Sequence, residues 1–168
     1  MRHAHADYSK PAEWNTKGWG YDLAPLSKKG IEESKAVVNL VRVINPDYII
    51  CSPATRALET ATHIIRELGT RFSIEFDLHE WVPNHSFEWR GIEDVEKLER
   101  DFNSKNGVHT VGAPECWESY KFMKDRMDRT LRKYQNYPKV LVVCHSLLMK
   151  SIYGNDSIDH TDIVEYQL

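Results

Sequence analysis

At 168 residues the chain has the length of one domain, and a formal net charge of −3 argues against general nucleic-acid binding, which usually relies on a basic face. A hydrophobic fraction of 41% predicts an ordinary globular core, and three cysteines without a Cys-x-x-Cys pair suggest neither a disulfide framework nor a zinc knuckle. No apolar run approaches the roughly 18 residues of a membrane span and no signal-peptide pattern is visible, so we expect a cytoplasmic protein without a membrane partner.

The first part of the chain predicts a long loop followed by a helix. Residues 7–26 mix glycine, proline and aromatic side chains, a composition typical of a loop. Ser27 is suited to cap a helix, because apolar residues then recur at a 3.6-residue period until Asn45-Pro46 ends it.

A short apolar strand and a second helix are predicted next. Residues 47–51 form an apolar run of strand length. Ser52 is expected to cap the following helix, with Pro53 in its first turn. Gly69 then marks the end of that helix.

The second half of the chain continues this alternation of strands and helices. The expected elements are a weaker strand at 73–76, a helix near 93–102, an amphipathic helix from 114–117 to Tyr137-Pro138, a buried strand at 139–144, a helix at 147–153 and an edge strand at 161–167. Strands that alternate with helices predict an α/β fold, a three-layer α/β/α sandwich with a mostly parallel central sheet.

Basic side chains follow three of the predicted strands. In sheets of this kind, ligands bind beyond the carboxyl ends of the strands, where His3, Arg56 and His145 are expected. Arg56 lies in the first turn of its helix, where free N–H groups and the helix dipole favour an anion. Arg2 and Arg56 each offer a planar fork that suits phosphate oxygens. Each residue alone would be ordinary, but together they predict a phosphoryl site.

Three stretches resemble the signature motifs of the histidine phosphatase superfamily, the phosphoglycerate-mutase-like group. They are Arg2-His3-Ala4, Ser52-Pro53-x-x-Arg56-Ala57-x-x-Thr60-Ala61 and Val143-Cys144-His145-Ser146. Two further stretches are similar to that family's sequence: Asp22-Leu23-Ala24-Pro25-Leu26-Ser27-x-x-Gly30, and Pro114-Glu115-Cys116-Trp117 followed by Arg126. The resemblance implies a phosphoglycerate-mutase-like fold and a phosphatase that acts on a small phosphorylated substrate.

The resemblance also implies a role for each motif residue. His3 would be the nucleophile that forms a phosphohistidine, and Glu80, in Leu78-His79-Glu80-Trp81, would be the general acid. The phosphoryl oxygens would be held by four residues: Arg2, Arg56, His145 and Asn15. No metal and no cofactor is implied, because arginines and histidines take that role.

The chemistry sets requirements on two of these groups. His3 must be neutral to attack, and positive neighbours lower the pKa of an imidazole. Glu80 must start protonated, which an apolar setting beside Trp81 would favour. Asp77 and Glu88 are the competing carboxylates.

The chain is expected to be one histidine-phosphatase-like domain over residues 1–168. That family places an apolar central strand before its arginine-histidine pair, whereas only Met1 stands there here, so we expect a truncated first strand. Residues 81–114 are expected to form a lid insertion over the pocket that includes four candidate specificity residues: His85, Trp89, Arg90 and His109. The sequence leaves the oligomeric state open.

Three alternatives remain. A phosphoglycerate-mutase-type phosphotransferase shares the same first step, and a non-catalytic binder of phosphorylated ligands shares the same pocket. The run His3-Ala4-His5-Ala6-Asp7 also resembles the His-x-His-x-Asp cluster of zinc-dependent hydrolases, although Tyr8 stands where a further histidine is usual.

Overall fold

A three-stranded parallel sheet forms the centre of the computed structural model, which describes residues 1–112, 114–154 and 157–167. The strands are β1 (Tyr48–Cys51), β2 (Phe72–Ile74) and β3 (Val140–Val143), in the order β2-β1-β3. Ile50 of β1 stands opposite Ser73 on one side and Val142 on the other. The predicted parallel sheet is therefore confirmed.

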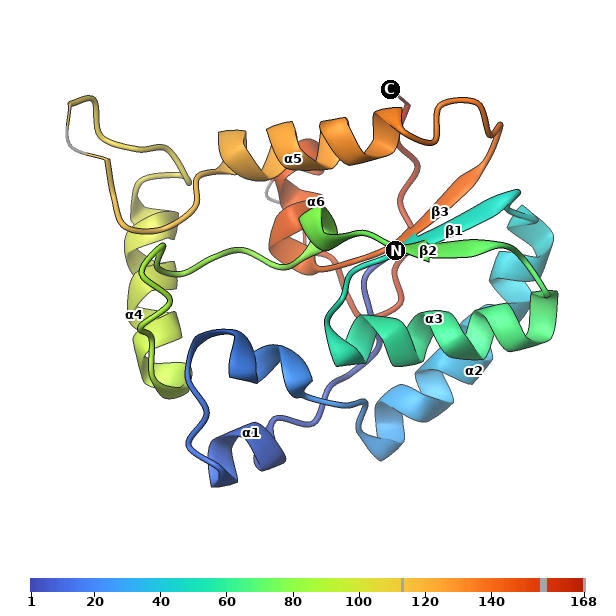
Figure 1. Cartoon of the computed structure of the whole chain (residues 1–168), viewed down its shortest axis with the longest axis horizontal. Coiled ribbons are helices and arrows are strands. Elements are labelled where there is room, and N and C mark those ends of the chain that lie inside the picture. The colour runs from blue at the N-terminus through green and yellow to red at the C-terminus, as the bar shows by residue number, and fades with distance from the viewer. Residues whose placement is uncertain (113, 155–156, 168) are drawn as a thin grey trace.

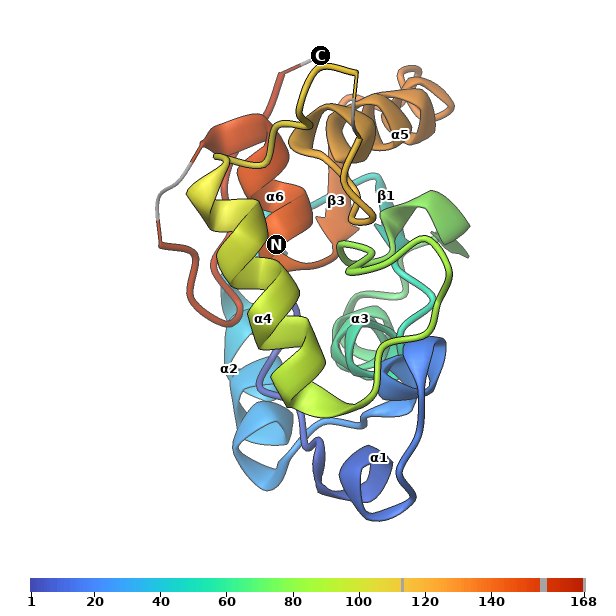
Figure 2. The ribbon, with the colours of Figure 1, turned by 90° about the vertical axis from the view of Figure 1, so that its left-hand side faces the viewer.

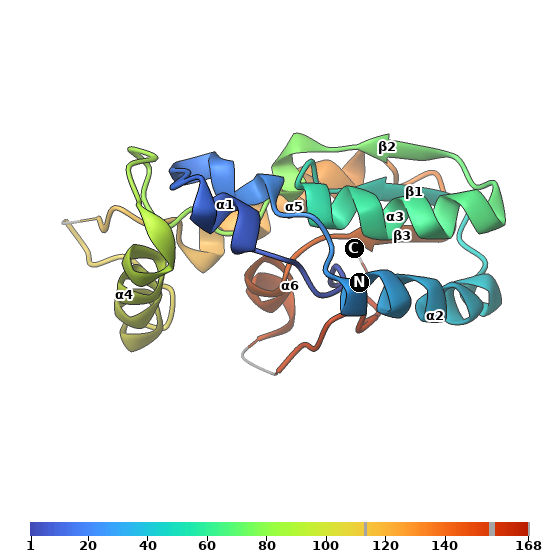
Figure 3. The same cartoon turned by 90° about the horizontal axis from the view of Figure 1, so that it is seen from below.

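Helices cover both faces of this sheet (Figures 1 and 3). The α-helices are α1 (Ser9–Glu13), α2 (Lys28–Ile44), α3 (Thr55–Leu68), α4 (Gly91–Ser104), α5 (Tyr120–Arg132) and α6 (Ser146–Tyr153), and two 3-10 helices are η1 (Gly18–Leu23) and η2 (Phe76–Leu78). In Figure 1, α2 and α3 lie below the sheet and α5 above it, which gives the predicted α/β layers. No helix among the described residues is long and apolar enough to cross a membrane.

The alternation of side chains along β1 divides the core into two clusters. Ile49 and Cys51 pack with α2 and α3, whereas Ile50 packs with residues of α5 and α6. All three are fully buried. A parallel strand with helices on both faces needs apolar side chains on both, which explains the continuous apolar run in the sequence.

Residues 1–3 lie beside β3 and extend the sheet by a short parallel segment. Arg2 forms a single parallel bridge with Cys144. The backbone hydrogen bonds are Met1 N to Val142 O (2.7 Å), Cys144 N to Met1 O (2.9 Å), His3 N to Cys144 O (2.9 Å), Arg2 N to Asp162 O (3.0 Å) and Thr161 N to Arg2 O (3.1 Å). Few residues are therefore enough here to hold His3 at the carboxyl end of β3.

Several predicted elements differ from those observed. Residues 7–26 are not all loop, because short-range hydrogen bonds form α1 and η1 there. Ser52 does not cap α3: its N–H still bonds to Val143 O at 3.0 Å as an extension of β1, so the helix begins after Ala54. Gly69 ends α3 in a left-handed conformation, as predicted.

Three more elements differ from the prediction in their boundaries or type. The helix expected from 114–117 begins only at Tyr120, where the Ser119 side chain caps it. Phe76, expected in a strand, belongs to η2. Residues 161–167 form no strand, because their described link to the sheet is limited to the two hydrogen bonds with Arg2.

We expect Gly30→Ala to destabilise the fold by about 1–3 kcal/mol, as overpacking typically does. Ser27 caps α2 by accepting from Gly30 N at 3.1 Å, and a Cβ at Gly30 would lie 2.0 Å from the carbonyl oxygen of His5. Denaturant unfolding measures the change. Lys29→Ala, at an exposed position of the same turn, is the control and should stay within about 0.5 kcal/mol. Equal stability of both variants would contradict this close approach.

Candidate active site

Three segments that are far apart in sequence meet at the carboxyl end of the sheet. Arg56 Nε donates a hydrogen bond to His3 Nε2, and Arg56 Nη2 donates one to His145 Nδ1, each at 3.2 Å. The exposed fractions of His3, Arg56 and His145 are 5%, 4% and 0%. Three of the predicted site residues are thus brought together around one guanidinium.

The hydrogen bonds assign a tautomer to each histidine. His3 Nδ1 lies 2.7 Å from the carbonyl oxygen of Ala4, which can only accept, so the proton is on Nδ1 and the lone pair is on Nε2. His145 accepts from Arg56 at Nδ1, so its Nε2 carries the proton and donates to Ser52 Oγ at 2.7 Å. Both imidazoles are neutral in this arrangement, and His3 turns an unprotonated nitrogen toward the shared arginine.

Burial is the main reason that both histidines stay neutral. It holds the pKa of His3 well below its usual value, and the Arg56 charge lowers it further. The pKa of His145 is lowered by burial, then by Arg56 and His3. The lowered pKa of His3 agrees with the prediction from the sequence. The prediction named neighbouring positive charge as the cause, whereas burial is the larger cause.

The remaining arm of Arg56 is held by a carboxylate. Asp22 Oδ1 accepts from Arg56 Nη1 at 2.9 Å and fixes the rotation of the guanidinium. The sequence did not single out Asp22, although it lies in a stretch that resembles the family. Ser52 was predicted to cap a helix and belongs to a stretch that resembles a family motif, but no contact with His145 was predicted. Its hydroxyl accepts from His145 Nε2 and from the N–H of Ala54.

The Glu80 side chain lies at the same end of the sheet, where it contacts the start of α6. Its Oε1 accepts from Trp81 N at 2.9 Å and from Leu148 N at 3.2 Å, and Leu148 lies in the first turn of the helix that follows His145. Burial raises the pKa of Glu80, while these N–H groups and the Arg56 charge oppose the rise. The direction agrees with the expectation from the sequence.

The competing carboxylates have other surroundings. Asp77 pairs with Arg129 on α5 at 3.7 Å, and Glu88 is exposed. Neither is joined to His3, Arg56 or His145 by a hydrogen bond or ion pair of the described residues. Of the three carboxylates considered, Glu80 is the one in contact with the helix that begins after His145.

Arg2 and His160 are two further basic residues close to His3. Arg2 Nη1 donates to Ile158 O at 2.7 Å, and its Nε is buried without a hydrogen-bond partner among the described residues. The ring of His160 lies 5.8 Å from that of His3 and 5.2 Å from that of His5, centroid to centroid. The sequence analysis did not single out His160, which directly precedes the expected strand at 161–167.

Asn15 is the predicted site residue that the structure does not bring to this cluster. It is exposed at the end of α1, with φ at 50°, and its N–H bonds to Ala12 O. No hydrogen bond of the described residues joins its side chain to His3, Arg56 or His145. Its role in phosphate binding stays a prediction.

The cluster expected for a zinc hydrolase does not form around His3. His5 Nδ1 bonds to Ser27 Oγ at 2.8 Å, and Asp7 Oδ1 accepts from Ser9 N at 2.9 Å. In the part of the chain that the structure describes, no three or more His, Cys, Asp or Glu side chains are placed to hold a metal ion. The geometry therefore gives the zinc alternative no support.

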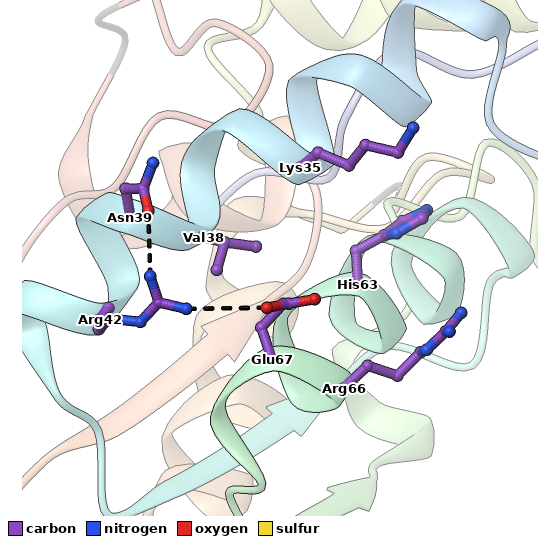
Figure 4. A pocket seen from close by; sticks show the side chains of 7 residues that line it. All are labelled: Lys35, Val38, Asn39, Arg42, His63, Arg66 and Glu67. Atoms are coloured by element: carbon purple, nitrogen blue, oxygen red, sulfur yellow. Dashed lines mark hydrogen bonds and ion pairs between the residues drawn. The ribbon is translucent and has the colours of Figure 1, made fainter.

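A groove of about 370 Å³ between α2 and α3 is not this site (Figure 4). It is lined by Lys35, Val38, Asn39, Arg42, His63, Arg66 and Glu67. Arg42 pairs there with Glu67 at 3.7 Å and bonds to Asn39 at 3.1 Å. The groove lies at the end of α3 opposite to Arg56.

The fold and this cluster define a mixed α/β protein with basic side chains at the carboxyl ends of parallel strands. The family model of the histidine phosphatase superfamily (branch 1) matches residues 1–156, so the chain belongs to that superfamily.

Phosphatases are among the proteins that this chain resembles. The chain is 26% identical over 145 residues to the adenosylcobalamin/alpha-ribazole phosphatase of Escherichia coli K12, an alignment that covers 80% of this chain and 70% of that protein. The crystal structure of the alpha-ribazole phosphatase from Shigella flexneri is similar in fold, with a TM-score of 0.62 and 23% identity over 92% of this chain and 78% of that one. A mycobacterial glucosyl-3-phosphoglycerate phosphatase in complex with inorganic phosphate has a TM-score of 0.68 at 16% identity, covering 90% and 74%.

Proposed function

We propose that this chain is a metal-independent phosphatase that hydrolyses phosphomonoesters through a phosphohistidine on His3. One observation carries the proposal: the Arg56 guanidinium bonds to the unprotonated Nε2 of His3 and to Nδ1 of His145. A phosphoryl group beside His3 Nε2 would therefore meet a buried positive charge that is already oriented. Such preorganised charge is the main requirement of phosphoryl transfer.

In the first step, His3 Nε2 attacks phosphorus and the bond to the leaving oxygen breaks. Arg56 and Arg2 neutralise the phosphoryl oxygens, and the buried Nε of Arg2 gains an acceptor there. Glu80 gives its proton to the leaving oxygen. Because Oε1 of Glu80 already accepts two N–H groups, Oε2 is the oxygen that carries this proton.

In the second step, water replaces His3 on phosphorus. The Glu80 carboxylate takes a proton from the water as it attacks, and the bond between phosphorus and His3 Nε2 breaks. Inorganic phosphate leaves, and Glu80 is protonated again for the next turnover.

We propose a small phosphorylated metabolite as the substrate, as in the named relatives. The segment 81–114 contains α4, which lies on the side toward which the strands point and stands in the foreground of Figure 2. Arg90 pairs there with Lys17 of the N-terminal segment in an antiparallel bridge. We assign the choice of leaving group to this segment.

A panel of phosphate esters, with a phosphohistidine protein included, tests the proposal. Release of inorganic phosphate that persists in EDTA is expected. Transfer of the phosphoryl group to an added phosphoglycerate instead of water would identify a mutase. Phosphate binding without turnover of any ester would identify a binding protein, and loss of turnover in EDTA with recovery on adding zinc would overturn metal independence.

We expect activity to fall on the alkaline side as Glu80 loses its proton. Because burial raises the pKa of Glu80, the protonated acid persists above the usual range of a carboxyl group and is lost as the pH rises through the raised value. Glu80→Gln should lower kcat by about 10²–10⁴-fold and remove this limb of the pH–rate profile. Glu88→Gln, at an exposed neighbouring carboxylate, is the control and should leave the profile unchanged. A rate that keeps rising above about pH 9 would exclude Glu80 as the acid.

A further inference from the structure

A buried ion pair lies next to the segment that holds Glu80. Arg126 of α5 bonds to Glu118 through Nε to Oε1 at 2.7 Å and through Nη2 to Oε2 at 3.0 Å. The two side chains are 5% and 7% exposed. Glu118 directly precedes Ser119, whose side chain caps α5, and Arg126 lies in the middle of that helix.

The other donors and acceptors of this pair all go to residues 77–82. Arg126 Nη1 donates to the carbonyl oxygens of Asp77 (2.5 Å) and His79 (2.8 Å), and Nη2 donates to that of Glu80 (3.3 Å). From the Glu118 side, the contacts are Trp81 Nε1 to Glu118 O (2.7 Å), Val82 N to Glu118 Oε2 (3.3 Å) and Glu118 N to Val82 O (2.9 Å). The pair thus holds the backbone before, at and after Glu80.

Glu80 needs such support because no helix or strand contains it. It lies between η2 and α4, and its carboxyl is held at Oε1 by the N–H groups of Trp81 and Leu148. A proton donor must lie within hydrogen-bond reach of the leaving oxygen, and a misplacement of about 1 Å can cost about 10²-fold in rate. The irregular backbone at Glu80 therefore needs support from outside its own segment.

We propose that the Glu118–Arg126 pair is a positioning device for Glu80, which serves proton transfer and leaves phosphoryl binding by His3, Arg56 and His145 unaffected. This inference rests on the proposed function. Stability alone is a poor explanation for the pair, because a buried ion pair is often matched or exceeded by apolar side chains of similar volume. Apart from the bonds within the pair, its described hydrogen bonds all go to residues 77–82. A need to hold Glu80 in a fixed position explains this arrangement.

The leaving group of the substrate separates positioning from a general structural role. An aryl phosphate with an acidic phenol needs little protonation of its leaving oxygen, whereas an alkyl phosphate needs a proton from Glu80. Arg126→Lys keeps the charge but loses the planar fork. In single-turnover measurements of phosphohistidine formation, we expect this variant to lose at least about 10-fold more rate with the alkyl ester than with the aryl ester.

Two further variants complete the experiment. Glu118→Gln replaces one of the two carboxylate oxygens that accept from Arg126 by an amide group that cannot accept. We expect this variant, too, to lose more rate with the alkyl ester than with the aryl ester. Arg129→Lys is the matched control: Arg129 lies on the same helix, is 65% exposed and pairs with the Asp77 side chain at 3.7 Å, so both esters should react as in the parent protein.

The coupling to Glu80 is measured in a double variant. Adding Arg126→Lys to Glu80→Gln should cause no further loss with the alkyl ester, because the group that it positions is already absent. Equal losses with both esters, whether from an unfolded chain or a distorted site, or losses that multiply in the double variant, would overturn the proposal. Failure of the proposed function would look different from failure of the positioning proposal: the parent protein itself would form no phosphohistidine with either ester.

Discussion

His3→Ala is expected to abolish turnover of phosphate esters, with a loss of roughly 10⁴-fold or more in kcat. His3 Nε2 is the unprotonated nitrogen that faces Arg56, and the variant leaves no other group in its place. Brief exposure of the parent protein to a labelled ester should trap an adduct that is labile in acid and stable in base. The same adduct should be missing from His3→Ala.

His5→Asn is the matched control for that experiment. His5 is the neighbouring histidine, but its Nδ1 bonds to Ser27 Oγ, a contact that an asparagine amide can reproduce. We expect both the adduct and the turnover to persist. If the two variants lost activity to the same extent, a shared role of His3 and His5 in a metal cluster would replace the nucleophile proposal.

Arg56→Lys is expected to lower kcat/KM by about 10²–10³-fold, the range typical for the loss of an oriented donor. One guanidinium bonds to His3, His145 and Asp22 at the same time. The lysine ammonium is a compact charge without the planar, widely spaced N–H groups that these three bonds need. Steady-state kinetics and the affinity for inorganic phosphate measure the effect. Arg66→Lys, at an exposed position of the same helix, should change neither quantity.

The pH profile of Arg56→Ala gives an independent readout. Burial and then the Arg56 charge hold the pKa of His3 down, so removal of the charge lets that pKa rise. Because only neutral His3 attacks, the acidic limb of the rate profile should move to higher pH. Arg56→Lys keeps a charge and should show less movement. An acidic limb that stays in place in Arg56→Ala would mean that Arg56 does not act on His3 electrostatically.

The order of strands and helices was predictable because the residues that form it are close in sequence. Apolar side chains at a 3.6-residue period marked α2, and the continuous apolar run before His145 marked β3. The errors lie where backbone partners come from distant parts of the chain: Ser52 N bonds to Val143 O of β3, and the described backbone hydrogen bonds of residues 161–167 to the sheet are the two with Arg2. Local pattern carries no information on such partners.

The candidate site divides in the same way. His3, Arg56 and His145 could be predicted together, because Arg56 and His145 follow β1 and β3, and His3 ends the short segment that lies beside β3. The role of Asp22 and the link from Glu80 to α6 were not readable, since each depends on how an irregular segment packs. Asn15 follows α1, a helix that formed where an open loop was predicted, and the structure leaves it exposed.

By itself, the sequence determined the alternation of elements, the parallel sheet and the chemical groups at its carboxyl edge, because periodicity and motif spacing are local properties of the chain. Only the tertiary structure decided which groups meet. Arg56 and His145 are 89 residues apart, and Arg126 reaches the carbonyl of Glu80 across 46 residues. Contacts at such separations depend on packing of both faces of the sheet. The tautomer of His3, the depressed pKa values of both histidines and the backbone support of Glu80 all arise from that packing.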